Sequence, residues 1–246
     1  MTIALATLAS TACTAVESPN DPVDPEPEQE IASVTADMTP DPVTPKKMPS
    51  TCQELLDTGT PAVDGEYELH VGGDETKPWL AYCADMASTP KEYLPLVFVL
   101  GDHNYSQYTA GGASFGSNVR TNYLRLRIDP ATLMVDIGDQ AFAISSGSLV
   151  HSGSTPVSSM PFGVAMSCDN AASGTADIDL RGTPFTLGSQ FAVSGFSPKG
   201  TSTLDSRSAQ ATLQGGGYCG WTSIVNAPSN PFNAAHASVL QLVYTP

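Results

Sequence analysis

Basic residues are scarce in this sequence. Ten Lys and Arg stand against 25 Asp and Glu, which gives a formal net charge of −15 at pH 7. A polyanion would therefore meet net repulsion, and we expect no nucleic-acid partner. Charged residues make up only 14% of the chain, whereas it contains 21 Gly and 20 Pro. This composition favours strands joined by turns over helices.

The zinc-metalloprotease motif is also missing. The chain has no His-Glu-x-x-His, the pattern that holds the zinc of metalloproteases. Gly112-Ala113-Ser114-Phe115-Gly116 has the Gly-x-Ser-x-Gly spacing, but it lies in a predicted low-complexity loop rather than at a strand-to-helix elbow, and Gly147–Ser148 does not complete the pattern. A Ser/His/Asp triad could be assembled from Ser152, His151 and Asp102, but such sets occur by chance in a serine-rich chain. We expect no catalytic residues, and the alternative is a secreted hydrolase whose site is not visible in sequence.

No aromatic residue occurs between Thr14 and Ser50. This segment holds eight prolines, and its eight acidic residues face only Lys46 and Lys47. It cannot bury enough apolar surface to fold, so residues 14–50 are predicted to be a disordered, acidic, Pro-rich linker. We expect a spacer here, with a docking peptide as the alternative. Beyond it, residues 51–246 retain 17 acids and 8 bases and are predicted to form one domain.

The first 13 residues are apolar and end in a cysteine. Met1–Cys13 has the apolar run and small residues of a secretory signal peptide, and it is too short to span a bilayer. Cys13 follows Ser10-Thr11-Ala12, a placement that resembles a bacterial lipoprotein signal in which this cysteine is lipidated. We therefore expect an exported protein, either a lipoprotein of the bacterial cell envelope, held to the membrane through a lipid anchor, or a secreted protein. An ordinary N-terminal tail with an incidental cysteine is the alternative.

Four cysteines remain if Cys13 is lipidated. An even set in an exported chain predicts two disulfides, and three pairings are open. We favour the pairs that are local in sequence, Cys52 with Cys83 and Cys168 with Cys219. A zinc site would require clustered ligands, and the cysteines show no C-x₂-C spacing. The histidines are isolated from them in sequence, so we expect no metal ligands among His70, His103, His151 and His236.

Strand signals recur along the domain. Apolar and polar residues alternate in four segments, which predicts half-buried antiparallel strands at Glu66–Val71, Leu124–Asp129, Asp177–Arg181 and Val239–Tyr244. The apolar run Val97–Leu100 predicts a central strand, and Asp129-Pro130 predicts a turn before a strand at Leu133–Ile137. Residues Gly101–Gly116 and Ser145–Pro161 are predicted to be loops. Cys52–Asp57 is predicted to be a short helix, capped by Ser50 or Thr51 and stopped by Gly59.

Several short blocks resemble the GON domain, an accessory module of secreted metalloproteases of the disintegrin-and-thrombospondin type that also occurs in bacterial secreted proteins. The blocks run in order from Thr51 to Gly220 and include Cys52–Leu55, Asp64–Tyr67, Tyr82–Met86, Pro90–Leu94, Asn104–Ser106, Leu126–Asp129, Gln140–Ala143 and Gly216–Gly220. The resemblance implies a mainly β, disulfide-stapled antiparallel domain with one short helix. It also implies an accessory role rather than proteolysis, or a metallopeptidase-associated protein as an alternative.

Binding residues are less well defined. An unidentified extracellular protein or glycan partner would require exposed aromatic side chains, and the candidates are Trp79, Tyr105, Tyr108 and Trp221. For each of them, packing in the core or against a disulfide is the favoured alternative. The residues Asp85, Lys91, Glu92 and Arg127 are predicted to form a structural ion-pair network rather than an acid–base pair of Asp85 and Glu92. Five acidic residues have two interpretations: they are calcium ligands, or they lie on solvated strand faces. They are Asp129, Asp136, Asp139, Asp177 and Asp179.

Overall fold

A computed structural model describes residues 47–110, 118–151, 154–225 and 238–246. The predicted signal segment and most of the linker lie outside this part of the chain. The compact unit runs from Pro45 to Pro246. The backbone N–H of Met48 donates to Gly73 O (3.1 Å), and that of His70 donates to Pro49 O (2.9 Å). Residues 47–50, assigned above to the linker, therefore pack with the folded domain.

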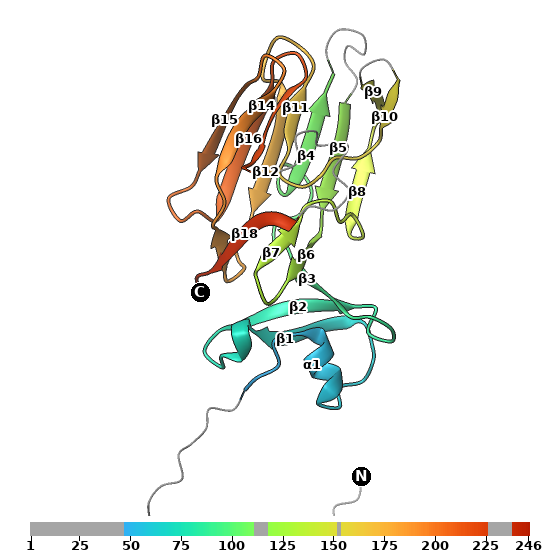
Figure 1. Ribbon diagram of the computed structural model, residues 1–246, viewed down its shortest axis with the longest axis vertical. Coiled ribbons are helices and arrows are strands. Elements are labelled where there is room, and N and C mark those ends of the chain that lie inside the picture. Colours follow the sequence, from blue (N-terminus) through green and yellow to red (C-terminus); the bar gives the residue numbers. More distant parts are fainter. Residues whose placement is uncertain (1–46, 111–117, 152–153, 226–237) are drawn as a thin grey trace, which may run out of the picture. The chain divides into compact units, whose positions relative to one another are not determined.

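The helix α1 spans Cys52–Asp57 (Figure 1), as predicted. Thr51 is its N-cap, because the Thr51 hydroxyl accepts from the Glu54 N–H at 3.0 Å. The Glu54 carboxylate accepts in turn from the Ser50 N–H at 2.7 Å and from Lys47 Nζ at 2.6 Å. After Thr58 the chain leaves the helix through Gly59, whose φ of 92° suits glycine.

Glu54 gives α1 a pH-dependent stability. The hydrogen bond from Lys47, followed by those from Ser50, lowers the pKa of Glu54 from 4.5 to about 2. Its contribution is therefore complete above about pH 4.5 and is lost as the pH falls towards 2. Glu54→Gln is expected to lower the free energy of unfolding by about 1 kcal/mol at pH 7.

Urea unfolding of both proteins at pH 7 and pH 2.5 measures this effect. Glu75→Gln, at an exposed site, is the matched control and should change little at either pH. An equal cost of Glu54→Gln at both pH values would show that the ionised carboxylate does not stabilise the helix.

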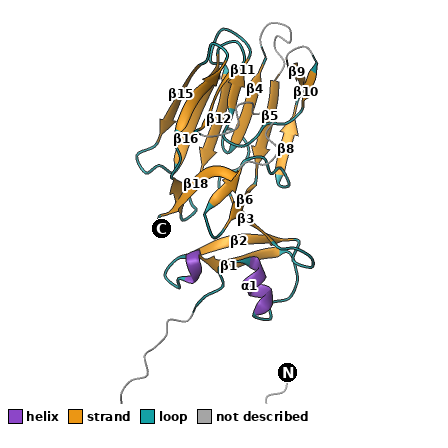
Figure 2. Ribbon diagram, viewed as in Figure 1, coloured by secondary structure: helices purple, strands orange, loops and turns teal. Residues whose placement is uncertain are grey.

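Seven strands form the first sheet, and every neighbouring pair in it is antiparallel. Figure 2 shows how strands dominate the fold. In spatial order the strands are β1 (Gly65–His70), β2 (Pro78–Ala84), β3 (Lys91–Pro95), β6 (Arg125–Asp129), β7 (Met134–Asp136), β18 (Ser238–Tyr244) and β13 (Phe185–Leu187). A 3₁₀ turn, η1 (Val71–Gly73), follows β1. The predicted strands at residues 66–71, 124–129, 133–137 and 239–244 are thus present with shifted ends.

The second sheet contains nine strands. Its main path is β14 (Phe191–Gly195), β17 (Gly220–Ile224), β11 (Ala165–Ser167), β4 (Tyr105–Thr109), β12 (Gly174–Asp179), β16 (Gln210–Gly216) and β15 (Lys199–Leu204). Strand β5 (Asn118–Tyr123) joins β4 to β8 (Ala143–Ser146), and β9 (Leu149–His151) pairs separately with β10 (Thr155–Val157). The pair β4–β11 is parallel, and the other pairs described are antiparallel.

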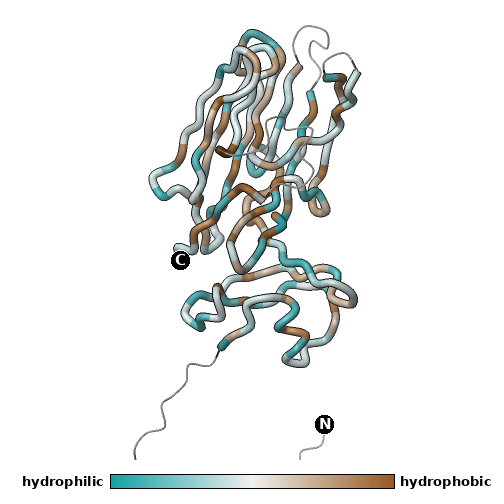
Figure 3. Tube along the Cα trace, in the orientation of Figure 1, coloured by the Kyte–Doolittle hydropathy of each residue, from teal (hydrophilic) through white to brown (hydrophobic). Residues whose placement is uncertain are grey.

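The interior contains two apolar clusters. The larger one includes residues of both sheets and the Cys52–Cys83 disulfide, whose Cα atoms are 5.7 Å apart. The smaller one, here called the satellite core, consists of Tyr108, Ala110, Val119, Leu149, Val157, Met160, Val164 and Met166. The second disulfide, Cys168–Cys219, packs against it. Figure 3 shows hydrophobic and hydrophilic residues alternating along the strands that surround these clusters. Both favoured disulfide pairings and the mainly β class are confirmed.

Three predictions about local structure are wrong. Val97–Leu100 is an exposed loop rather than a central strand, because Leu100 and Gly101 take left-handed φ angles of 65° and 55° that turn the chain. The predicted loops at residues 101–116 and 145–161 include β4 and β8–β10. β12 is buried on both faces rather than half-buried, and it lies in the interior of the second sheet, between β4 and β16. In the part of the chain that the structure describes, no helix is long and apolar enough to cross a membrane.

Candidate functional site

The aromatic binding candidates lie mostly in the interior. Trp79, Tyr105 and Tyr108 are 3%, 8% and 1% exposed. Trp79 packs edge-to-face on Phe185, with ring centroids 5.6 Å apart. Trp221 is partly buried against the satellite core. These side chains therefore support packing and do not form an exposed aromatic surface.

The 97–100 loop (Val97–Leu100) presents apolar side chains to solvent instead. Its four residues are 56%, 40%, 37% and 46% exposed. The Phe98 ring is held beside the Arg181 guanidinium, whose carbon lies 5.0 Å from the ring centroid, and beside the His103 ring at 5.5 Å. The Asn104 side-chain amide donates to Phe98 O at 2.8 Å. The loop is thus an exposed apolar segment with a fixed position, a feature typical of binding surfaces.

A cavity of about 580 Å³ lies near this loop. Its lining includes Arg181, Gly182 and Arg207. Val97 packs against Gly182, where an added Cβ would come within 2.9 Å of a Val97 methyl. Arg181 therefore lies beside the exposed apolar loop, and Arg207 lines the adjoining cavity together with Asp205.

Two buried carboxylates hold this region together. Asp179 accepts hydrogen bonds from Arg181 Nε (2.8 Å) and Nη2 (2.6 Å), and His103 Nδ1 lies 2.9 Å from its second oxygen. The His103 contact has ion-pair distance but not the alignment of a hydrogen bond. Burial opposes ionisation of Asp179, but the hydrogen bonds from Arg181 outweigh it and hold its pKa below the usual value. Asp179 is therefore an ionised, paired group.

Asp177 differs from its neighbour on the same strand face. Burial raises the pKa of Asp177, although hydrogen bonds from Gln210 Nε2 (2.9 Å) and from the Asn104 N–H (3.1 Å) oppose the increase. Candidate ligand atoms of His103, Asp177 and Asp179 lie within 4.8 Å of one another. A cation here would have to displace the guanidinium of Arg181. The two aspartates are structural, and the solvated strand face predicted as the alternative to calcium is wrong because both are buried.

The other acidic residues proposed for calcium support turns. Asp129 accepts from the Ala131 N–H at 2.8 Å, and Asp136 accepts from the Gly138 N–H at 2.9 Å. Asp139 accepts from the Ala141 N–H at 3.0 Å. In each case a side-chain oxygen binds the backbone two residues later, as in an Asx turn.

The candidate acid–base groups are paired with cations. Lys91 Nζ lies 2.8 Å from Asp85 Oδ2, and Arg127 Nη1 lies 3.3 Å from Glu92 Oε2. Glu92 also accepts from the Cys52 N–H at 2.9 Å, which ties α1 to β3. The four residues therefore form two ion pairs, as the structural interpretation predicted.

The members of the chance Ser/His/Asp set have separate environments. Asp102 lies 3.5 Å from Arg120 Nη2, whereas His151 lies against Tyr108 and Cys168. Ser152 and Gly112–Ser114 lie outside the described residues.

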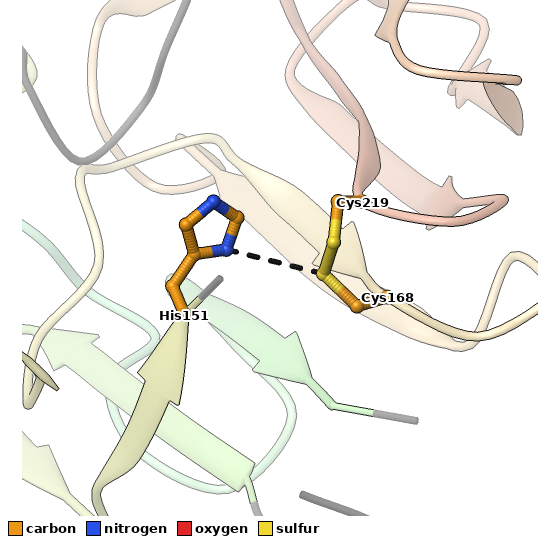
Figure 4. Close-up of side chains that lie close together, drawn as sticks. All are labelled: His151, Cys168 and Cys219. Carbon is orange, nitrogen blue, oxygen red and sulfur yellow. Dashed lines mark hydrogen bonds between the residues drawn. A yellow bond between two sulfur atoms is a disulfide. The ribbon is translucent and has the colours of Figure 1, made fainter. Parts of the chain in front are cut away.

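His151 and the second disulfide form the cluster shown in Figure 4. His151 Nδ1 lies 3.9 Å from Cys168 Sγ. The Tyr108 hydroxyl lies 2.8 Å from both of these atoms. Burial lowers the pKa of His151 and raises the pKa of Tyr108 to about 12, so both side chains are neutral at pH 7. His151 is therefore close to the cysteines in space, although the sequence separates it from them.

The elements around this cluster come from four parts of the chain. Tyr108 belongs to β4 and His151 to β9, while Cys168 follows β11 and Cys219 precedes β17. Pairing of β11 with β17 places Ser167 opposite Gly220, which brings the two cysteines together. Sequence reasoning missed this cluster because no local spacing links the four residues.

One family model matches the chain, that of the GON domain, over residues 49–114. A GON domain is present. The match takes in α1, β1 to β4, the Cys52–Cys83 disulfide and the 97–100 loop. The GON resemblance is thus confirmed for residues 49–114, and from there to Gly220 it stays a prediction. No curated protein and no solved structure matches the chain.

One candidate region lies within the residues that match the GON domain, and the other lies beyond them. The exposed 97–100 loop lies inside it, whereas His151, Cys168 and Cys219 lie beyond its last residue. The loop therefore belongs to the part of the chain that is similar to the GON domain, and the His151 cluster belongs to the remainder.

Proposed function

We propose that this protein is an exported, lipid-anchored, non-catalytic module that binds a protein or glycan partner at the cell surface. The GON domain at residues 49–114 carries the proposal, since it resembles an accessory module of secreted proteins. The predicted lipidation site Cys13 and the acidic linker would hold the domain away from the membrane. The two disulfides favour an oxidising compartment.

The 97–100 loop is the binding surface that the geometry supports best. Its side chains are apolar and exposed, and the adjoining cavity supplies the guanidinium groups of Arg181 and Arg207. Apolar contact next to cationic hydrogen-bond donors suits a partner that combines an apolar face with carboxylate or hydroxyl groups. The exposure of this apolar loop favours a binding role over the alternative, a secreted hydrolase.

Cells producing the full chain test both parts of this proposal. The wild-type protein is expected in the membrane fraction, with a mass that fits acylated Cys13 and four further thiols that appear only after reduction. Cys13→Ser should leave the membrane fraction and lose the acyl mass. An unmodified wild-type chain with free thiols would contradict both the anchor and the oxidising compartment.

Binding is measured on the same preparations with a panel of polysaccharides and extracellular proteins. Phe98→Ser is expected to remain anchored but to bind at least about tenfold more weakly, because an aromatic side chain at the centre of an interface typically contributes more than about 1.4 kcal/mol. Val193→Ser, at a similarly exposed apolar site on β14, is the matched control. Equal binding by wild type and Phe98→Ser would place the partner elsewhere on the chain.

A further inference from the structure

The Cys168–Cys219 disulfide has a potential metal ligand beside it, the imidazole of His151 (Figure 4). Candidate ligand atoms of His151, Cys168 and Cys219 all lie within 4.8 Å of one another. They come from different elements and are all partly buried. Among the described residues, the other disulfide, Cys52–Cys83, does not belong to a group of three or more potential metal ligands. The cluster is thus specific to one disulfide of the two.

Backbone hydrogen bonds hold the two cysteines together independently of the S–S bond. The Cys219 N–H donates to Ser167 O at 2.9 Å, and the Tyr218 N–H donates to Asp169 O at 2.7 Å. The Cys168 N–H donates to Thr109 O at 3.2 Å, which fixes this cysteine beside β4 and Tyr108. Breaking the S–S bond therefore leaves both Sγ atoms near His151.

The spacing of these atoms fits a tetrahedral zinc ion. With Zn–S bonds of about 2.3 Å and Zn–N bonds of about 2.0–2.1 Å, neighbouring ligand atoms are roughly 3.5–3.8 Å apart. His151 Nδ1 and Cys168 Sγ are already 3.9 Å apart. Once reduced, Cys219 Sγ needs only a side-chain rotation to reach the same separation. The Tyr108 hydroxyl, 2.8 Å from Cys168 Sγ, is placed to hydrogen-bond to a ligating thiolate.

We propose that reduction of Cys168–Cys219 by a thiol turns this cluster into a zinc site formed by Cys168, Cys219 and His151. Two equivalents of the thiol reduce the disulfide to two protein thiols and are themselves oxidised to one disulfide. Zinc then binds both sulfurs as thiolates, and two protons are released to solvent. Thiolate and imidazole ligands select zinc over calcium or magnesium.

Exposure decides which disulfide a thiol attacks first. Cys52 and Cys83 are fully buried, whereas Cys168 and Cys219 are partly exposed. Limited treatment of the full chain with dithiothreitol is therefore expected to free two thiols, which alkylation and peptide mapping assign to Cys168 and Cys219. This property goes beyond the proposed surface-binding role and does not depend on it.

Zinc and cobalt titrations of the full chain, freed of reductant under anaerobic conditions, test the proposal. One metal ion is expected per reduced chain, and the cobalt form should show the absorption of a thiolate-ligated tetrahedral ion. The oxidised chain should bind at least about 100-fold more weakly. His151→Gln is expected to weaken zinc binding by the reduced chain. The loss should exceed the roughly 10–100-fold that is typical when a residue that hydrogen-bonds to a metal ligand is removed.

Two control variants separate this site from others. His103→Gln, in the other histidine cluster, should leave zinc affinity unchanged. Tyr108→Phe should weaken zinc binding less than His151→Gln does. Reduced wild type that binds no zinc, His151→Gln that binds as tightly as wild type, or loss of the β circular dichroism signal on selective reduction would each overturn the proposal.

Discussion

Replacing Asn104 by alanine is expected to lower the free energy of unfolding by about 4 kcal/mol. Its buried side chain accepts from the Asp179 N–H at 2.8 Å and donates to Asp179 O at 2.7 Å and to Phe98 O at 2.8 Å. Alanine removes all three hydrogen bonds and leaves buried polar groups unpaired. The variant should also release the 97–100 loop. Urea unfolding, followed by circular dichroism, measures the change.

Two further variants divide this effect into its causes. Asn104 has a φ of 49°, which alanine adopts at a cost and glycine adopts freely. Asn104→Gly should therefore be less destabilised than Asn104→Ala by about 1 kcal/mol. Asn118→Ala, at an exposed position of β5, is the matched control and should change little. A cost below about 1 kcal/mol for Asn104→Ala would show that water replaces the lost hydrogen bonds.

The double substitution Cys52→Ala and Cys83→Ala removes the first disulfide. It is expected to lower the free energy of unfolding by a similar amount. The bond closes a loop of 31 residues, and the chain-entropy relation gives about 4 kcal/mol for that length. The disulfide also joins α1 to β2 within the larger apolar cluster. Denaturant unfolding under non-reducing conditions measures the loss.

The single variant Cys13→Ser is the control for this experiment, since it removes a cysteine that neither disulfide uses. Its unfolding midpoint should equal that of the wild type. A double variant that unfolds at the same denaturant concentration as the wild type would contradict a stabilising role for Cys52–Cys83.

Local sequence rules predicted the parts of this fold that depend on neighbours along the chain. Thr51 and Gly59 delimit α1 because capping and glycine chemistry act within a few residues. Alternation located β1, β6 and β18, since each has one face on the apolar cluster. The same rule failed for β12, where Asp177 and Asp179 are buried and their carboxylates bind Gln210 and Arg181. Alternation identifies a polar face but not what covers it.

The candidate sites depended on contacts that no local spacing encodes. Val97–Leu100 has the composition of a buried strand, but a turn at Leu100 and Gly101 leaves the run on the surface. His151 reaches Cys168 only because β9 and β11 both lie against the satellite core. Such proximity depends on tertiary contacts, which local patterns in a single sequence do not identify.

The position of β18 in the first sheet has a consequence for biosynthesis. Ser238–Tyr244 pairs with both β7 and β13, yet it follows, along the chain, all the other strands that the structure describes. A nascent chain therefore cannot complete this sheet until those residues have been made. Until then the edges of β7 and β13 carry unpaired backbone groups, which can pair with other chains. Folding of this sheet must therefore avoid such pairing until Ser238–Tyr244 is available to bind β7 and β13.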